Sequence, residues 1–334
     1  MNPPPVPIPT YSRRDFVGLL AKAGAAVPIA GLAAQAHAAQ PAATTSAPAS
    51  AAPTCLHVFS KPLQWMSYDE TAALLAEAGY GGIDIGVRPG GYVLPEKVET
   101  DLPRAVEAAR KHGLKMEMIV TAITDPREKY AETILKTAAQ LGVKCYRLGY
   151  VSYDDKAGVW ASLQKHKATF QALAELNARC GIHGAYQNHA GVRVGGPVWD
   201  LHELVRDADP RWLGVQYDVR HATAEGGESW PVGFRLLQPW IRCTDIKDFH
   251  WVQSAGKGVI EDVPMGEGIV NFDLYFQLVR ELKVTGPISV HFEYPPFERL
   301  KEPLPPAKKR EVFLAAMKKD LAVLKARMAK QQVV

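Results

Sequence analysis

The chain has 334 residues, of which 47% are hydrophobic and 22% charged, and its formal net charge at pH 7 is +4. A chain of this length holds one large domain or two ordinary ones. The charges are scattered and nearly balanced, so the sequence has no basic surface of the kind that binds nucleic acid, and we expect no nucleic-acid partner.

The N-terminus carries the pattern of an export signal. Arg13-Arg14 precedes a weakly hydrophobic run from Val17 to about Ala34, and residues 36–38 (Ala-His-Ala) form a small-x-small cleavage site. Residues 1–38 therefore predict a twin-arginine signal peptide and a periplasmic mature protein.

A membrane anchor is the alternative interpretation of the same run. Lys22 interrupts it, and it is shorter than the ~20 apolar residues of a spanning helix. Removal of the signal takes away three cationic residues and one acidic residue, which lowers the net charge from +4 to +2. No later apolar stretch is long enough to span a membrane, so we expect no stable membrane insertion.

The segment that follows the signal, residues 39–54, is rich in Pro, Ala, Ser and Thr, which is typical of a disordered linker. The four cysteines are far apart and lack metal-type spacing, so we predict free thiols. They are Cys55, Cys145, Cys180 and Cys243.

From residue 55 to about 328, short apolar runs alternate with runs of helical periodicity. The predicted strands are Leu56–Ser60, Gly82–Val87, Lys115–Thr121, Lys144–Gly149, Ile182–Asn188, Leu213–Asp218, Ile241–Lys247 and Ile288–Glu293. The predicted helices are Thr71–Ala78, Arg104–Lys111, Ala131–Gln140, Ala161–Arg179, Trp199–Arg206, Pro231–Leu237, Phe272–Leu282 and Lys308–Lys325. Eight strand–helix units predict a single (β/α)8 TIM barrel of class α/β. A doubly wound open sheet is the rival, but no Gly-rich phosphate fingerprint follows the first strand.

Polar residues gather at the ends of the predicted strands, where such barrels build their sites. Side chains two positions apart on a strand share a face, and this groups four same-face pairs. The pairs are Gln187 with His189, Gln216 with Asp218, Asp245 with Lys247, and His291 with Glu293. Unpaired charges are too costly to bury, so these groups are paired, solvated or bound to a cation. Arg147 on the fourth strand, His221 after the sixth and Arg88 in the loop after the second complete the candidate site.

The motifs resemble those of the xylose isomerase-like barrel superfamily, which includes sugar isomerases, epimerases and endonuclease IV. The resemblance covers the mature chain. The residues that carry it are Tyr186-Gln187-Asn188-His189, Asp218 with His221, Ile246-Lys247-Asp248, Val263-Pro264-Met265-Gly266-Glu267-Gly268 before Asn271-Phe272, and His291-Phe292-Glu293. It implies one divalent metal ion (Mn²⁺, Mg²⁺, Co²⁺ or Zn²⁺) whose ligands, placed on this chain, are Gln187, Asp218, Asp245 and Glu293.

Two of these positions depart from the family pattern. Gln187 stands where a glutamate is common, and Asp245 stands where a histidine commonly precedes the Lys-Asp pair. In the epimerases the carboxylates of strands five and eight exchange a proton across two faces of a carbon. An amide cannot act as a base, so the resemblance leaves Glu293 as the base here. Lys247, His189 or His291 is its candidate acid partner, and Arg147, His221, His291 and Arg88 are candidate substrate contacts.

We therefore expect a metal-dependent isomerase or epimerase that acts on an unphosphorylated sugar or keto-sugar by abstracting a proton next to a carbonyl. One alternative is a 3-keto-glycoside lyase of the same fold, and the other is a non-catalytic periplasmic sugar-binding barrel. The endonuclease branch fits poorly, because it needs more histidine ligands and a basic groove. A small sugar or glycoside is the expected partner, and the sequence leaves self-association open.

Overall fold

The computed structural model describes residues 55–298 and 302–333 of the chain. Eight parallel strands close into a barrel in the order β1-β10-β7-β6-β5-β4-β3-β2. These strands are β1 (Leu56–Phe59), β2 (Gly82–Val87), β3 (Lys115–Thr121), β4 (Cys145–Arg147), β5 (His183–Gln187), β6 (Leu213–Asp218), β7 (Ile241–Ile246) and β10 (Ile288–Val290). The predicted (β/α)8 TIM barrel is confirmed. The predicted signal peptide (1–38) and linker (39–54) lie outside the described residues.

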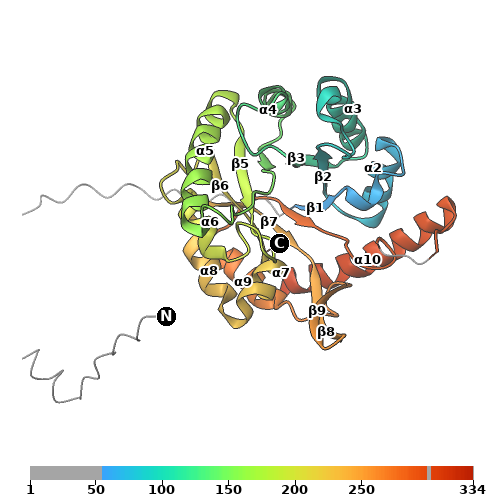
Figure 1. Cartoon of the computed structure of the whole chain (residues 1–334). Coiled ribbons are helices and arrows are strands. Elements are labelled where there is room, and N and C mark those ends of the chain that lie inside the picture. Colours follow the sequence, from blue (N-terminus) through green and yellow to red (C-terminus); the bar gives the residue numbers. More distant parts are fainter. Residues whose placement is uncertain (1–54, 299–301, 334) are drawn as a thin grey trace, which may run out of the picture. The chain divides into compact units, whose positions relative to one another are not determined.

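Helices surround the barrel and cover its outer surface (Figure 1). They are α2 (Tyr68–Ala78), α3 (Val98–Lys111), α4 (Ala131–Gln140), α5 (Val159–Cys180), α6 (Val198–Val205), α7 (Val219–Gly226), α8 (Trp230–Leu237), α9 (Phe272–Glu281) and α10 (Pro306–Lys330). Short 3-10 turns lie at Lys61–Leu63, Pro95–Lys97, Gly227–Ser229 and Gln238–Trp240. None of the described helices is long and apolar enough to cross a membrane.

Local sequence signals explain where the first helix begins and ends. The Ser67 hydroxyl accepts a hydrogen bond from the Glu70 backbone N–H, and the Glu70 carboxylate accepts one from the Ser67 backbone N–H, which completes a capping box before α2. Gly79 ends the helix with φ of 92°, a left-handed conformation that a side chain would strain. These two caps therefore set the bounds of α2 ahead of β2.

Strand alternation divides the barrel side chains between two environments. Tyr186, Tyr217, Ile246 and Phe292 are buried in the main hydrophobic cluster together with residues of the surrounding helices. They therefore pack outward from the barrel, beneath the helices. The inward-facing residues form layers instead: Met118, Cys145, Ala185 and Cys243 make a separate small cluster. Two positions further on, toward the C-terminal end, three of these strands carry the polar residues Arg147, Gln187 and Asp245.

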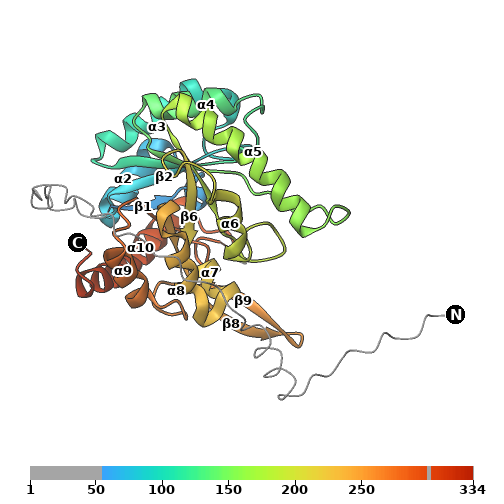
Figure 2. The same ribbon diagram turned by 90° about the vertical axis from the view of Figure 1, so that its left-hand side faces the viewer.

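Three features differ from the sequence prediction. Helix α7 begins directly after β6, with Asp218 as its N-cap. An antiparallel hairpin of β8 (Asp248–Ser254) and β9 (Lys257–Val263) is inserted after β7, and it projects beyond the helices (Figure 2). Sequence reasoning missed the hairpin because its exposed, largely polar strands lack the apolar run of a barrel strand. The β10 ladder also ends at Val290, earlier than predicted.

Asp248 fixes the segment that returns from this hairpin to the barrel. Its carboxylate accepts backbone N–H groups from Phe249 at 2.9 Å, Gly266 at 2.9 Å, Gly268 at 3.0 Å and Val270 at 3.1 Å. A Cβ on Gly268 would lie only 2.2 Å from the Asp248 carboxylate, so glycine is required there. One buried side chain thus anchors the hairpin directly after the seventh barrel strand.

Asp248→Ala leaves four N–H groups without their acceptor. We expect the free energy of unfolding to fall by at least about 3 kcal/mol, because each of the four hydrogen bonds to this charged acceptor is worth about 1.5–3 kcal/mol. Urea unfolding followed by circular dichroism measures the change, with the exposed Asp155→Ala as the matched control. A loss below about 1 kcal/mol would contradict this account of the anchor.

Candidate active site

The ten residues predicted for the site lie at the C-terminal end of the barrel, on or after β2, β4, β5, β6, β7 and β10. The residues are Arg88, Arg147, Gln187, His189, Asp218, His221, Asp245, Lys247, His291 and Glu293. Most of them touch one another directly. Arg88 joins indirectly: its guanidinium lies 5.5 Å from the Phe59 ring centroid, and that ring packs against His291 at 4.8 Å.

Gln187 is the centre of the hydrogen-bond network. Its Oε1 accepts hydrogen bonds from Arg147 Nη1 at 3.1 Å and from the Tyr150 hydroxyl. Its Nε2 donates to Asp218 Oδ2 at 3.1 Å and to Asp245. A guanidinium only donates and an ionised carboxylate only accepts, so these partners fix which end of the amide faces which group. The amide nitrogen therefore bridges two fully buried carboxylates.

Asp218 is held by backbone contacts as well as by side chains. Asn188 Oδ1 accepts the Asp218 N–H at 2.8 Å, and Asn188 Nδ2 donates to the Asp218 carbonyl at 2.9 Å. Asp218 Oδ1 accepts the His221 backbone N–H at 3.0 Å at the start of α7. Burial raises the pKa of Asp218, and the nearby Lys247 ammonium opposes that rise. Asn188 and α7 thus orient a buried carboxylate toward the barrel mouth.

Lys247 lies between two carboxylates. Its Nζ donates to Glu293 Oε2 at 2.9 Å and lies 3.5 Å from Asp218 Oδ2. Burial disfavours the charged lysine, but Glu293 and Asp218 outweigh burial and raise the pKa of Lys247. In the same way burial is outweighed at Glu293, where Lys247 and His291 hold the pKa well below its ordinary value. The site therefore has an ammonium beside an ionised carboxylate, and the Glu293 side chain keeps 21% of its surface exposed.

A group of carboxylates around the His291 imidazole lies deeper in the barrel. His291 Nε2 is 3.3 Å from Asp245 Oδ1, and Gln216 Nε2 donates to both oxygens of Asp245 at 2.8 and 2.7 Å. Burial opposes protonation of His291, but Asp245 raises its pKa to about 9. Asp84 from β2 accepts the Ser289 hydroxyl at 2.9 Å, and burial together with the Asp245 charge raises its pKa to about 7.

The four ligands that the resemblance implied do not fit a metal ion as they are arranged. The Gln187 oxygen is turned away toward Arg147, and the amide nitrogen and the Lys247 ammonium already face the carboxylates. An ion at this position would meet donors rather than free lone pairs.

The group of Asp84, Asp245 and His291 fits a divalent ion better. Each residue offers one ligand atom, and these atoms lie within 4.8 Å of one another. Asp84 Oδ1 is buried without a hydrogen-bond partner, and the buried His291 Nε2 contacts only Asp245 Oδ1 within the group, at 3.3 Å. Two carboxylates and one imidazole suit Mn²⁺, Co²⁺ or Zn²⁺. Of the four expected ligands, only Asp245 belongs to this group.

Aromatic and basic side chains form the rim of the site. The His189 and His221 rings stack with centroids 3.8 Å apart, and Tyr150 packs edge-on against His189 at 5.0 Å. The Arg193 guanidinium lies 4.7 Å from the Tyr150 ring centroid. Burial lowers the pKa of His189 to about 4 and holds that of His221 well below its ordinary value. Both imidazoles are therefore neutral near pH 7.

Sequence reasoning missed the part played by Asp84, Asn188 and Tyr150. Asp84 is the single charged residue in the otherwise apolar strand β2, and a fully buried carboxylate in such a run is a signal that was available. Asn188 was part of the matched motif, but its hydrogen bonds to Asp218 depend on how β5 and β6 align. Tyr150 follows the fourth strand, and only the folded chain brings it to Gln187.

A closed (β/α)8 barrel whose strand ends carry these polar groups defines a TIM barrel with its site at the C-terminal end. The chain belongs to the xylose isomerase-like TIM barrel family, whose sequence profile matches residues 72–319. No curated protein matches the chain at a significant level.

Solved structures of several other proteins share the fold, among them two sugar epimerases. The IolI protein with a bound zinc atom is 18% identical over 82% of this chain and 99% of its own, with a TM-score of 0.62. The 3-keto-D-glucoside 4-epimerase YcjR of E. coli is 13% identical over 82% and 99%, with a TM-score of 0.59. D-Psicose 3-epimerase of Clostridium cellulolyticum H10, solved with D-tagatose, is 11% identical over 81% and 99%, with a TM-score of 0.59.

The neutral state of His189 is open to a direct test. We expect the imidazole to titrate near pH 4 in the folded protein and near its ordinary value of about 6.5 in the urea-unfolded chain. NMR of histidine-labelled protein measures both, and His189→Gln assigns the resonance. A folded-state pKa above 6 would show that burial does not control this side chain.

Proposed function

We propose that the protein is a sugar isomerase or epimerase-type enzyme that acts on an unphosphorylated sugar or keto-sugar by removing a proton next to a carbonyl. The observation that carries the proposal is the pair of Glu293 and Lys247, an ionised carboxylate and an ammonium 2.9 Å apart at the barrel mouth. The folds of a keto-glucoside epimerase and a psicose epimerase, which this chain shares, support the same substrate class.

Glu293 is the base in this proposal because it is the exposed carboxylate of the group. Its low pKa keeps it ionised, and its partner Lys247 presents N–H donors from an almost buried position. Proton removal beside a carbonyl builds negative charge on the carbonyl oxygen, and a fixed ammonium stabilises that charge. Lys247 then donates a hydrogen bond to the developing oxyanion, while Arg147 and Asp218 hold Gln187 and Lys247 in place.

A second candidate, a 3-keto-glycoside lyase, is favoured by the environment of Gln187. Both ends of this amide are engaged, and an amide cannot act as a base at neutral pH, so Gln187 does not replace the second carboxylate of an epimerase. In a 3-keto-glycoside, Glu293 takes the proton from C2. The C2 electron pair forms the C1–C2 double bond, and the C1–O bond breaks with its electrons on the leaving oxygen, which is then protonated.

The metal ion implied by the family enters the proposal at the deeper group. Asp84, Asp245 and His291 would hold it, and when bound it would supply a positive charge beneath the mouth that polarises a substrate carbonyl.

Export through the twin-arginine pathway, which the first 38 residues predict, is also part of the proposal. It is the reason for choosing an unphosphorylated substrate in the periplasm.

Glu293→Gln removes the proposed base and keeps its size. We expect turnover to fall by about 10²- to 10⁴-fold, since that is the usual contribution of general base catalysis. Incorporation of deuterium from D₂O beside the carbonyl, followed by NMR over a panel of keto-sugars and 3-keto-glycosides, measures the loss.

Glu298→Gln is the matched control, because Glu298 is likewise partly exposed and contacts Lys61, as Glu293 does. Its exchange rate should stay within about twofold of wild type, in contrast to the range above. Undiminished exchange in Glu293→Gln would remove Glu293 as the base. Sugar binding by the wild type without any exchange would favour the non-catalytic sugar-binding barrel.

The location of the metal is tested by Asp84→Asn. We expect this variant to hold one equivalent less chelator-sensitive metal, measured by mass spectrometry, while Asp218→Asn keeps the wild-type content, because only Asp84 belongs to the deeper group. If the metal were instead held by the ligands that the resemblance implied, which include Asp218 but not Asp84, Asp218→Asn would lower the metal content and Asp84→Asn would not. Retention of the full wild-type metal content in Asp84→Asn would therefore return the ion to the Asp218 and Glu293 position.

A further inference from the structure

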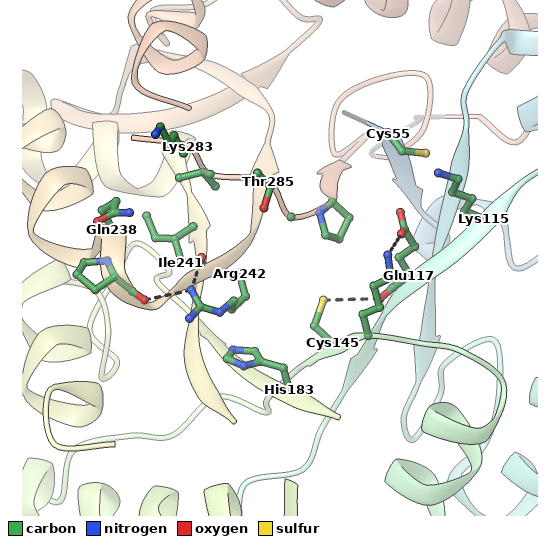
Figure 3. Close-up of a pocket in the computed structure, with 15 residues that line it drawn as sticks. Cys55, Lys115, Glu117, Cys145, His183, Gln238, Ile241, Arg242, Lys283 and Thr285 are labelled. Atoms are coloured by element: carbon green, nitrogen blue, oxygen red, sulfur yellow. Dashed lines mark hydrogen bonds and ion pairs between the residues drawn. The ribbon is translucent and has the colours of Figure 1, made fainter. Parts of the chain in front are cut away.

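A cavity of about 670 Å³ lies at the opposite end of the barrel, where the strands begin. Its wall carries Cys55, Glu117 and Cys145 together with four basic residues (Figure 3). The basic residues are Lys115, Lys144, Arg242 and Lys283. The layer of Met118, Cys145, Ala185 and Cys243 stands between this end and the polar network of the mouth, so the proposed reaction makes no use of the cavity.

Three metal-ligating side chains converge at the edge of this cavity. They are Cys55 and His57, two positions apart at the start of β1, and Glu117 on β3. Their ligand atoms lie within 4.8 Å of one another, and His57 Nε2 is 3.8 Å from Glu117 Oε2. Ligand atoms of a tetrahedral zinc ion stand about 3.3–3.8 Å apart, given bonds of about 2.0 Å to nitrogen or oxygen and about 2.3 Å to sulfur. A small movement of the side chains completes the site.

Hydrogen bonds orient the imidazole for coordination. His57 Nδ1 donates to the Cys55 carbonyl at 3.2 Å, since a carbonyl only accepts. Nε2 therefore carries the lone pair, which accepts the Glu117 backbone N–H at 3.4 Å and lies 3.8 Å from Glu117 Oε2; this long hydrogen bond is the contact that a cation would replace. A ligating histidine is usually fixed in this way, with the other ring nitrogen bonded to a carbonyl or carboxylate. The ring itself is fully buried.

Two consecutive glycines make room for the group. A Cβ on Gly81 would lie 2.7 Å from Cys55 Sγ, and a Cβ on Gly82 would lie 2.5 Å from the His57 ring. A side chain at either glycine would therefore clash. Because β2, which begins at Gly82, lies between β1 and β3, the two glycines leave the space that the Cys55 sulfur and the His57 imidazole occupy. Lys144 binds Glu117 Oε1 at 2.5 Å, which leaves Oε2 to face His57.

We propose that Cys55, His57 and Glu117 bind one borderline-soft divalent cation of the Zn²⁺ class. The cation joins β1 to β3 at the N-terminal end of the barrel, and its fourth position opens to the cavity and takes water. Binding exchanges the thiol proton, which passes to solvent, for a sulfur–metal bond. This site is separate from Asp84, Asp245 and His291 and does not depend on the proposed reaction.

Co²⁺ added to the metal-free full-length chain tests the proposal, because a thiolate ligand gives Co²⁺ a charge-transfer absorption in the near ultraviolet that oxygen and nitrogen ligands do not give. We expect this band in the wild type, its displacement by Zn²⁺, and its loss in Cys55→Ser. Glu117→Gln should weaken Co²⁺ binding by about 100-fold. Cys180→Ser is the matched control, since Cys180 is also partly exposed but lies outside the group.

Protection from alkylation gives a second measurement on the same samples. Zn²⁺ should slow the alkylation of Cys55 by iodoacetamide, measured by peptide mass spectrometry, and leave Cys180 unaffected. The band should persist in Asp84→Asn, which separates this site from the one at the barrel mouth. A wild-type chain with no thiolate band and no protection of Cys55, or a band that survives Cys55→Ser, would overturn the proposal.

Discussion

The amide of Gln187 lies between two carboxylates that have no access to water, and the rest of the barrel mouth is arranged around it. Two such charges side by side are tolerated only when donors face them. Gln187 Nε2 donates to both Asp218 and Asp245. Its oxygen must then face a donor, which is why Arg147 lies behind it. A glutamate at this position would add a third buried negative charge.

The same constraint explains the second departure from the family pattern. An aspartate replaces the histidine that commonly precedes the Lys-Asp pair, and His291 from the end of β10 lies 3.3 Å from that aspartate. The imidazole thus comes from the neighbouring strand of the closed barrel, since β10 pairs with β7. The two departures are linked, because Asp245 accepts hydrogen bonds from Gln187 and Gln216 and also raises the pKa of His291.

The sequence was sufficient to predict the barrel and ten of the residues at its mouth, because the strands and their same-face residues follow from local periodicity. Alternation along each strand placed Gln187, Asp245 and Glu293 at one end of the barrel. Which of these side chains bind one another could not be predicted, because contacts across a closed barrel depend on how its eight strands are staggered. Asp84 illustrates this: it meets Ser289 only because β2 and β10 flank β1. The hairpin was missed because its polar strands match neither periodicity.

The β8–β9 hairpin is joined to the mouth by an ion pair at its base. Asp262 on β9 binds the buried Arg220 guanidinium, and Arg220 Nη1 donates to His221 Nδ1 at 2.9 Å. Its tip at Ala255 and Gly256 has positive φ at both residues and makes no such connection to the barrel. For protein engineering, the tip is therefore the place to insert a fluorescent label or an affinity tag. Removing the base of the hairpin together with Asp262 would instead leave the buried Arg220 guanidinium without this carboxylate. That uncompensated charge would lie next to His221, which adjoins Asp218.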